Sequence, residues 1–221
     1  MRKLVVANQK GGVGKSTSAV NLAAGLAAAG QKTLLIDMDP QGNATFAAIG
    51  SREPPATTYE LLIGDLKAQD VIMAASPIGT DLIPADINLA GAEVELISAI
   101  GGQTRLRTKL AGLTGYDFVI IDAPPSLGLL TINALAAADE VIIPVSVSVF
   151  ALKGIFQLER TIDQVKRNLD RADLKIAGVL CTMSDHTNVA ADVEAAIRGR
   201  FGDLTFQTVI PKNIKLKFFV V

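Results

Sequence analysis

The chain is poor in aromatic residues, cysteine and histidine. Among its 221 residues there is no tryptophan, and aromatic residues make up 5%. The core must therefore consist of alanine, valine, leucine and isoleucine, which suits buried parallel strands between helices. The single cysteine, Cys181, cannot form an internal disulfide or a cysteine-rich zinc or iron–sulfur site. With one histidine, His186, a metal site built from several imidazoles is also excluded.

Signals for secretion or membrane insertion are lacking too. Residues 1–3 lead straight into an expected strand, so we expect no signal peptide. No apolar run approaches the roughly 20 residues that span a bilayer. Together with a free cysteine inside an apolar run, this predicts a cytoplasmic protein without stable membrane association.

The charge is small and unevenly distributed. Residues 1–149 hold 10 basic and 14 acidic residues, whereas residues 150–221 hold 11 and 8, which gives a formal net charge of −1. The chain is therefore not basic throughout. An anionic partner would bind the C-terminal third, although a solvated helix face can carry the same excess.

Short apolar runs alternate with helical patterns along the whole chain. Strands are predicted at 4–7, 33–37, 81–83, 118–122, 140–145, 175–181 and 206–210. Helices are predicted at 15–29, 89–100, 106–113, 129–137, 152–169 and 189–200. The alternation predicts an α/β fold, with a mostly parallel central sheet and helices on both faces. Residues 51–58 are the best predicted loop, and residues 1–221 are expected to form one domain, with its ligand at the carboxyl ends of the strands.

A glycine-rich loop follows the first predicted strand. Residues 10–17 read KGGVGKST and open into an alanine-rich helix. Such glycines let backbone N–H groups wrap around a phosphate, Lys15 can reach the β- and γ-phosphates, and the Ser16 hydroxyl can ligate Mg²⁺. Gln9 stands where the general pattern has its first glycine, so a turn that only joins strand to helix is the alternative. The nucleotide contacts are predicted to be Lys10, Gly11, Gly12, Val13, Gly14, Lys15, Ser16 and Thr17.

Carboxylates end two of the predicted strands. Asp37 and Asp39 lie two residues apart and so point to the same side of an extended chain. Asp37 can equally be an ordinary strand-end or capping residue. Asp122 ends an apolar strand, a common pattern that, after a phosphate loop, predicts a carboxylate holding Mg²⁺ through water.

These motifs resemble the ParA/Soj partition proteins, the deviant Walker A ATPases of the MinD/ParA superfamily. The resemblance extends from Leu4 to about Leu216 and rests on residues 10–17, 37–43 and 122–135. It implies a P-loop NTPase fold that binds ATP and Mg²⁺. It also implies that Lys10 crosses a dimer interface to the phosphates of the other subunit, whereas alone Lys10 would be an exposed loop lysine.

By the same resemblance, Asp39 positions the attacking water or helps to hold the Mg²⁺ shell. The expected catalytic residues are then Lys10, Lys15 and Asp39, and the expected metal-site residues are Ser16, Asp39 and Asp122. The reaction is hydrolysis of ATP by a positioned water, and it is expected to be slow without a partner.

The resemblance further assigns residues in the C-terminal third. Met183, Pro211 and Asn213 are expected beside the adenine, with core packing as the alternative for Met183. Non-specific DNA binding is assigned to Arg198, Arg200, Lys212 and Lys215, with Lys217 a weaker candidate and solvated surface charge the alternative for each.

Three segments depart from the family pattern. His186 stands where an arginine is frequent, and Ser148 and Val149 replace an acidic–aromatic pair. The chain ends in KLKFFVV, where the family continues through a proline-rich loop and another helix. We therefore expect a C-terminal end that is shortened relative to the family, whether by truncation or in an aberrant member.

The leading functional hypothesis is an ATP-dependent switch. It would form a homodimer on ATP, bind DNA non-specifically at the nucleoid, and be released when a ParB-like partner stimulates hydrolysis. The cargo would be a plasmid, a chromosome or an organelle. A MinD-like membrane-cycling ATPase needs an amphipathic C-terminal helix, for which the chain end is too short. The nitrogenase iron-protein class needs clustered cysteines, and a non-hydrolysing interaction protein stays open.

Overall fold

A computed structural model describes residues 1–74, 76–148, 151–185 and 187–213. Its strands are β1 (Arg2–Val6), β2 (Thr33–Asp37), β3 (Asp81–Ile83), β4 (Phe118–Asp122), β5 (Glu140–Ser146), β6 (Lys175–Ser184) and β7 (Thr205–Pro211). Its helices are α1 (Lys15–Ala28), α2 (Asn43–Ile49), α3 (Thr58–Ile63), α4 (Ala68–Val71), α5 (Leu89–Ser98), α6 (Arg105–Leu110), α7 (Leu129–Ala137), α8 (Ala151–Asn168) and α9 (Asn188–Phe201), with the 3₁₀ helices η1 (Gly102–Thr104) and η2 (Gly202–Leu204). Among the described residues, no helix is both long and apolar enough to cross a membrane.

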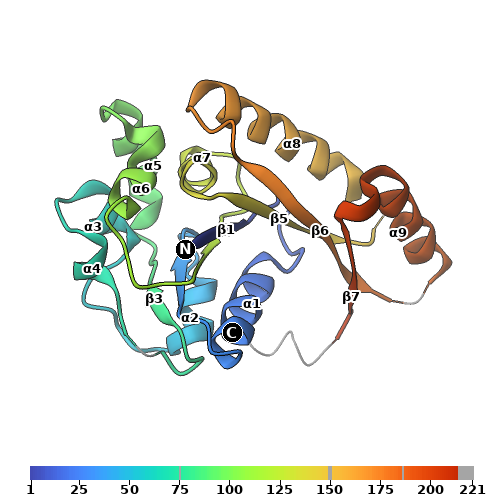
Figure 1. Ribbon diagram of the computed structural model, residues 1–221, viewed down its shortest axis with the longest axis horizontal. Coiled ribbons are helices and arrows are strands. Elements are labelled where there is room, and N and C mark those ends of the chain that lie inside the picture. Colours follow the sequence, from blue (N-terminus) through green and yellow to red (C-terminus); the bar gives the residue numbers. More distant parts are fainter. Residues whose placement is uncertain (75, 149–150, 186, 214–221) are drawn as a thin grey trace.

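The seven strands form one sheet in the order β3-β2-β4-β1-β5-β6-β7 (Figure 1). Every neighbouring pair in this sheet is parallel. Parallel neighbours require a crossover between strands, and helices supply these crossovers. The predicted α/β fold with a mostly parallel sheet is confirmed.

Helices cover both faces of the sheet, which explains why the strands read as continuous apolar runs. On one face α1 and α2 pack on Leu4 and Val6 of β1 (Figure 1). On the other face α5, α7, α8 and α9 share a larger core with Val5, which lies between Leu4 and Val6 in β1. Successive side chains of one strand thus enter two different cores, so a polar side chain on a central strand is buried whichever face it points to.

The strand order places the carboxyl ends of β1, β2 and β4 side by side. β4 lies between β1 and β2, and its last residue, Asp122, is in register with Val6 on one side and Asp37 on the other. The chain leaves β1 toward β2, whereas β5 joins the opposite side of β1. Open parallel sheets bind ligands where the strand order reverses in this way.

The six predicted helices and seven predicted strands are all present, with ends that shift by a few residues. The short helices α2, α3 and α4 were not predicted, because they offer too few turns for a periodic pattern. The first residue of α3, Thr58, also shortens the predicted loop 51–58. A capping box, in which Thr57 and Glu60 bond each other's backbone, was the available signal for α3.

A buried asparagine joins α7 to the segment before it. Asn133 has no exposed surface, and its Oδ1 accepts a hydrogen bond from the Leu106 N–H at 3.0 Å. Its Nδ2 donates to the carbonyl oxygens of Gly102 and Leu129, at 2.7 and 3.0 Å. One side chain therefore satisfies three backbone groups and fixes α7 against η1 and α6.

We expect Asn133→Ala to lower the free energy of unfolding by about 2–4 kcal/mol, because it leaves these buried backbone groups without partners. Urea unfolding followed by circular dichroism measures the change. The matched control is Asn168→Ala at the exposed end of α8, which should change stability by less than about 0.5 kcal/mol. Equal effects of the two substitutions would contradict the role given to Asn133.

Candidate functional site

A cavity of about 730 Å³ lies at the carboxyl ends of the strands. Its volume suits a bound small molecule or cofactor. Its lining brings together the glycine-rich loop, two loops after β2 and β4, and the two segments that end β6 and β7. The lining residues are Gly11, Gly12, Gly14, Lys15, Ser16, Thr17, Ser18, Asp39, Gln41, Asn43, Pro125, Thr182, Met183, Ile210, Pro211, Lys212 and Asn213.

The glycine-rich loop has a backbone that side chains would strain. Gly12 and Gly14 have φ angles of 68° and 82°, in the left-handed region that favours glycine. Gly14 directly precedes α1, and no side chain of the described residues caps this helix. The positive end of α1 and its first N–H groups can therefore bind an anion in the cavity.

Neighbouring strands hold this loop in place. Asn8 donates from Nδ2 to the Pro144 carbonyl of β5 at 2.6 Å, and its Oδ1 accepts from the Lys10 N–H at 3.0 Å. From β6, the Thr182 hydroxyl donates to the Val13 carbonyl at 2.9 Å. The loop is thus tied to two strands on the same side of β1, and neither tie was predicted from the sequence.

A lysine and an acid are buried together behind the loop. Lys15 is 6% exposed, and burial lowers its pKa while Asp122 and Asp39 act in the opposite direction. Asp122 has no exposed surface, and burial raises its pKa well above the ordinary range, with a further rise from Asp37. Lys15 and the Ser16 hydroxyl lower that pKa, although the hydroxyl does not reach hydrogen-bonding geometry.

Neither carboxylate oxygen of Asp122 has a hydrogen-bond partner among the described residues. A buried acid without donors is destabilising unless a cation or a ligand completes its surroundings. Carboxylate and hydroxyl oxygens are the ligands that Mg²⁺ prefers, and Mg²⁺ at phosphate sites takes only one or two carboxylates from the protein. No three acidic, histidine or cysteine residues cluster as an all-protein metal site in the part of the chain that the structure describes. The donor set therefore fits a magnesium ion that shares its ligands with a bound phosphate.

The two acids after β2 have different surroundings. Asp37 is fully buried, and its Oδ2 accepts from both the N–H and the hydroxyl of Thr45 at 2.8 Å. Its Oδ1 accepts from the Asp39 N–H at 3.0 Å, and burial raises its pKa to about 6. Asp37 thus anchors the start of α2, as its capping alternative supposed. Asp39 instead lies in the cavity lining, where its Oδ1 accepts from the Gln41 N–H at 3.0 Å.

Lys10, at the start of the loop, points toward β5 within its own chain. Its Nζ donates to the Ser148 hydroxyl at 2.9 Å, and that oxygen lies 3.4 Å from the Ser146 hydroxyl. Lys10 is not among the residues that line the cavity. Ser148, which departs from the family pattern, therefore has a contact that the sequence did not suggest. Val149 and His186, the other departures, lie outside the described residues.

The predicted adenine neighbours all line the cavity. Met183 and Pro211 lie at the ends of β6 and β7, and Asn213 follows β7 by two residues. Met183 is 40% exposed and has a φ angle of 56°, which few residues other than glycine adopt. It is therefore not a core residue, and its backbone turns at the cavity.

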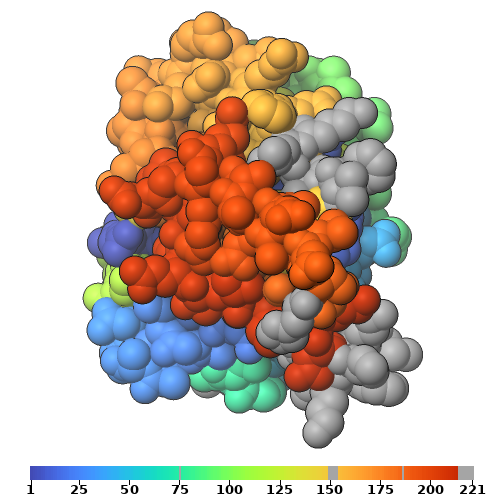
Figure 2. All heavy atoms as spheres, turned by 90° about the vertical axis from the view of Figure 1, so that its right-hand side faces the viewer, coloured from blue at the N-terminus to red at the C-terminus, as the bar shows by residue number. Residues whose placement is uncertain are grey.

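The described residues that were predicted to contact DNA belong to two different segments. Lys212 lines the cavity, whereas Arg198 and Arg200 belong to α9, on the face that Figure 2 shows. Arg198 pairs with Glu194 at 2.8 Å. Arg200 pairs with Glu159 at 2.7 Å and lies 4.1 Å from the ring centroid of Phe156 and 5.2 Å from that of Phe201. Lys215 and Lys217 lie outside the described residues.

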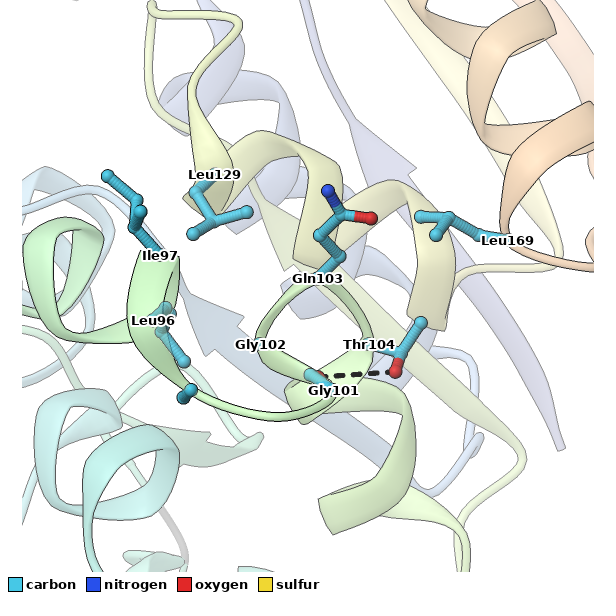
Figure 3. Close-up of a pocket in the computed structure, with 9 residues that line it drawn as sticks. Leu96, Ile97, Gly101, Gly102, Gln103, Thr104, Leu129 and Leu169 are labelled. Carbon is cyan, nitrogen blue, oxygen red and sulfur yellow. Dashed lines mark hydrogen bonds between the residues drawn. The ribbon is translucent and has the colours of Figure 1, made fainter.

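A second cavity, of about 340 Å³, lies between α5, η1, the start of α7 and the end of α8 (Figure 3). In Figure 3, Leu129 and Ile97 face Leu169 across the opening, with Gln103 between them. Of the residues that the structure describes, no charged one belongs to its lining, which consists of Leu96, Ile97, Ala99, Gly101, Gly102, Gln103, Thr104, Leu129 and Leu169. A phosphate-bearing ligand therefore belongs in the first cavity.

The surroundings of Asp37 and Asp39 predict that removing the first carboxylate lowers stability, whereas removing the second lowers activity. Asp37→Ala should lower the free energy of unfolding by about 2–4 kcal/mol, because the Thr45 and Asp39 N–H groups lose their acceptor. Asp39→Ala should change stability by less than about 1 kcal/mol and instead reduce ligand turnover in the cavity. Chemical unfolding together with phosphate release from ATP separates the two effects. A stable Asp37→Ala protein, or equal turnover in wild type and Asp39→Ala, would contradict these assignments.

The chain is similar to a family model and to proteins of known name. Residues 1–176 match the family model described as an AAA domain. The chromosome partitioning protein ParA of Myxococcus xanthus is 47% identical over 97% of this chain and 77% of its own length. The sporulation initiation inhibitor protein Soj of Bacillus subtilis is 46% identical over 96% of this chain and 85% of its own length.

A solved structure is similar over nearly the whole chain as well. It is titled cobyrinic acid a,c-diamide synthase from Mycobacterium smegmatis with bound ATP analog and magnesium. It has a TM-score of 0.88 and 39% identity, and the match covers 96% of this chain and 88% of that one. With near full-length relatives well above 30% identity, the chain belongs to the ParA/Soj family of chromosome-partitioning ATPases.

Proposed function

We propose that the chain binds Mg·ATP in the larger cavity and hydrolyses it slowly. The observation that supports this best is Asp122, a buried acid without a hydrogen-bond partner, beside the buried Lys15 at a glycine-rich loop. The Mycobacterium smegmatis structure, titled with an ATP analog and magnesium, supports the same ligand. The triphosphate would lie along residues 10–17, and the adenine would lie between Met183, Pro211 and Asn213.

The residues of this chain would act mainly by position and charge. Backbone N–H groups of the loop and the start of α1 cradle the phosphates, and Lys15 Nζ neutralises the charge that develops on them. Ser16, Asp39 and Asp122 would hold the Mg²⁺, directly or through water. When bound, this ion would neutralise negative charge on the β- and γ-phosphates.

Asp39 would orient the water that attacks the γ-phosphate. Its carboxylate lines the cavity and is held at one oxygen by the Gln41 N–H, which leaves the other oxygen for the water. No covalent intermediate is needed, because phosphoryl transfer to water depends on alignment and electrostatics. Lys10 would supply a further positive charge to the phosphates of a second subunit, and it must leave Ser148 to do so.

Lys10→Ala tests this last step. We expect the affinity for Mg·ATP to stay within about threefold of wild type, because Lys10 does not line its own cavity. Nucleotide-dependent dimerisation should be lost, and turnover should fall by about 10²–10³, since a charge supplied in trans acts on the transition state. Light scattering and phosphate release measure both, with Lys67→Ala at the start of α4 as the control. Unchanged dimerisation and turnover would exclude Lys10 from this role.

We further propose that ATP binding switches the protein onto DNA in a partitioning cycle. The name of the Myxococcus relative, chromosome partitioning protein ParA, supports a chromosome as cargo, with a plasmid or an organelle as the other possibilities. The protein would act at the nucleoid in the cytoplasm, and a ParB-like partner would stimulate hydrolysis and release. Because Arg198 and Arg200 share their charge with Glu194 and Glu159, each cation alone would bind DNA weakly. Two copies in a dimer, with Lys212 and Lys215, would bind more strongly, since linked sites raise the effective concentration.

DNA binding should therefore depend on both nucleotide and salt. With a slowly hydrolysed ATP analog, we expect affinity for random-sequence DNA at least about tenfold above that with ADP. The logarithm of the affinity should fall linearly with the logarithm of salt concentration, with a slope near −0.9 for each phosphate contact. Fluorescence anisotropy across a salt series measures both. Equal binding with ADP and analog would contradict the switch.

A further inference from the structure

Glu93 on α5 reaches across to the start of α7. Its Oε1 accepts a hydrogen bond from the Leu130 N–H at 3.4 Å. A Cβ atom placed on Gly128, which directly precedes α7, would overlap Glu93 Oε1 and lie 3.1 Å from Glu93 Cδ. The carboxylate thus occupies the space that a side chain at residue 128 would need.

This contact supplies what α7 lacks. No side chain of the described residues caps the helix at Gly128, and its first turn contains no acidic residue. The first N–H groups of a helix need acceptors, and its positive end favours a nearby negative charge. Glu93 provides both from a different helix, 37 positions before Leu130 in the sequence. Gly128 has a φ angle of −77°, which residues other than glycine also adopt, so the backbone conformation does not require a glycine here. The contact with Glu93, which leaves no room for a Cβ atom, explains why this residue is a glycine.

The start of α7 is also the end of the loop that leaves the candidate site. Residues 123–128 connect Asp122 to α7, and Pro125 in this loop lines the larger cavity. The Thr131 hydroxyl, in the first turn of α7, donates to the Ser126 carbonyl at 2.6 Å. A displacement of this first turn would therefore be transmitted to the wall of the cavity and to the loop behind Asp122.

We propose that Glu93 is a positioning residue for the nucleotide site, and that Gly128 exists to admit its carboxylate. By capping α7, Glu93 fixes the loop of residues 123–128, and through it the placement of Pro125 against the bound nucleotide. The functional part of this proposal rests on the proposed binding of Mg·ATP, whereas the contact itself is tested without nucleotide.

Four variants test the proposal: Glu93→Ala, Glu93→Gln, Gly128→Ala, and the double variant Glu93→Ala/Gly128→Ala. The matched control is Glu95→Ala, two residues along α5, whose Oε1 accepts from the Tyr59 hydroxyl at 2.8 Å. Amide hydrogen exchange of the peptide that contains Leu130 reports the contact in the absence of nucleotide. Equilibrium binding of Mg·ATP and the separate values of kcat and KM report the site.

Glu93→Ala should raise the exchange rate of the Leu130 amide by about tenfold, because it removes a charge-assisted acceptor. It should weaken Mg·ATP binding by about tenfold and change KM more than kcat, since the reacting groups are untouched. Glu93→Gln keeps an acceptor oxygen and should stay within about threefold of wild type. Gly128→Ala should match Glu93→Ala, because the flexible carboxylate moves away from the new Cβ. The double variant should equal Glu93→Ala or Gly128→Ala alone, since these two substitutions remove the same contact.

Additive effects in the double variant would overturn the account of Gly128. Wild-type exchange at Leu130 in Glu93→Ala would overturn the contact, whether or not nucleotide binds. Altered exchange with unchanged Mg·ATP binding in both Glu93→Ala and Gly128→Ala would overturn the positioning role. If wild type itself binds no Mg·ATP, the proposed function and the positioning role fail together, and the exchange result still decides the capping contact.

Discussion

The burial of Asp122 beside Lys15 is the arrangement on which the rest of the site depends. Asp122 is excluded from water at the end of a central strand, and its oxygens have no donors among the described residues. Lys15 is buried close enough to affect the pKa of Asp122, and each acts to keep the other charged. A pair of this kind favours folding only weakly, because desolvation opposes the attraction between the charges. A bound anion would give Lys15 a partner of opposite charge, and its magnesium ion would do the same for Asp122.

The fold brings these groups together from distant parts of the chain. Parallel register aligns Val6, Asp122 and Asp37 in one row, so the glycine-rich loop after β1 begins beside Asp122, with Asp37 one strand further away. Hydrogen bonds from Asn8 to β5 and from Thr182 to the loop then fix the backbone around the cavity. Asp37 is used to hold α2 rather than to bind a ligand. The residues proposed to bind and hydrolyse the ligand are thus different from those, such as Asn8, Thr182 and Asp37, that fix the backbone around the cavity.

Much of this could be predicted from the sequence, because the signals are local. Buried strands appear as apolar runs, and residues 10–17 predict a phosphate loop through the spacing of their glycines and Lys15. The short helix α2 could not be predicted, since it is seven residues long and is stabilised by Asp37 through a contact across eight positions. The spacing of Asp37 and Asp39 shows that they share a side of the chain, but it does not show to which of the two carboxylates Thr45 donates its hydrogen bonds. The contacts of Lys10 with Ser148 and of Glu93 with Leu130 join residues far apart in sequence, so only the tertiary structure shows them.

The stability of Asp122→Asn, with and without ligand, tests the account most directly. The neutral amide keeps the shape of the side chain and removes the desolvation cost of the acid. This cost outweighs the attraction of Lys15, since burial raises the pKa of Asp122 despite that attraction, so the ligand-free variant should be at least as stable as wild type. A saturating ligand at 100 times its Kd should stabilise wild type by about 2.7 kcal/mol, and the variant should lose most of this gain in Mg·ATP. Thermal and urea unfolding with no ligand, with ATP and EDTA, and with Mg·ATP give the comparison. A variant that is less stable without ligand, or that gains as much from Mg·ATP as wild type, would contradict the claim that Asp122 is held for a bound magnesium ion.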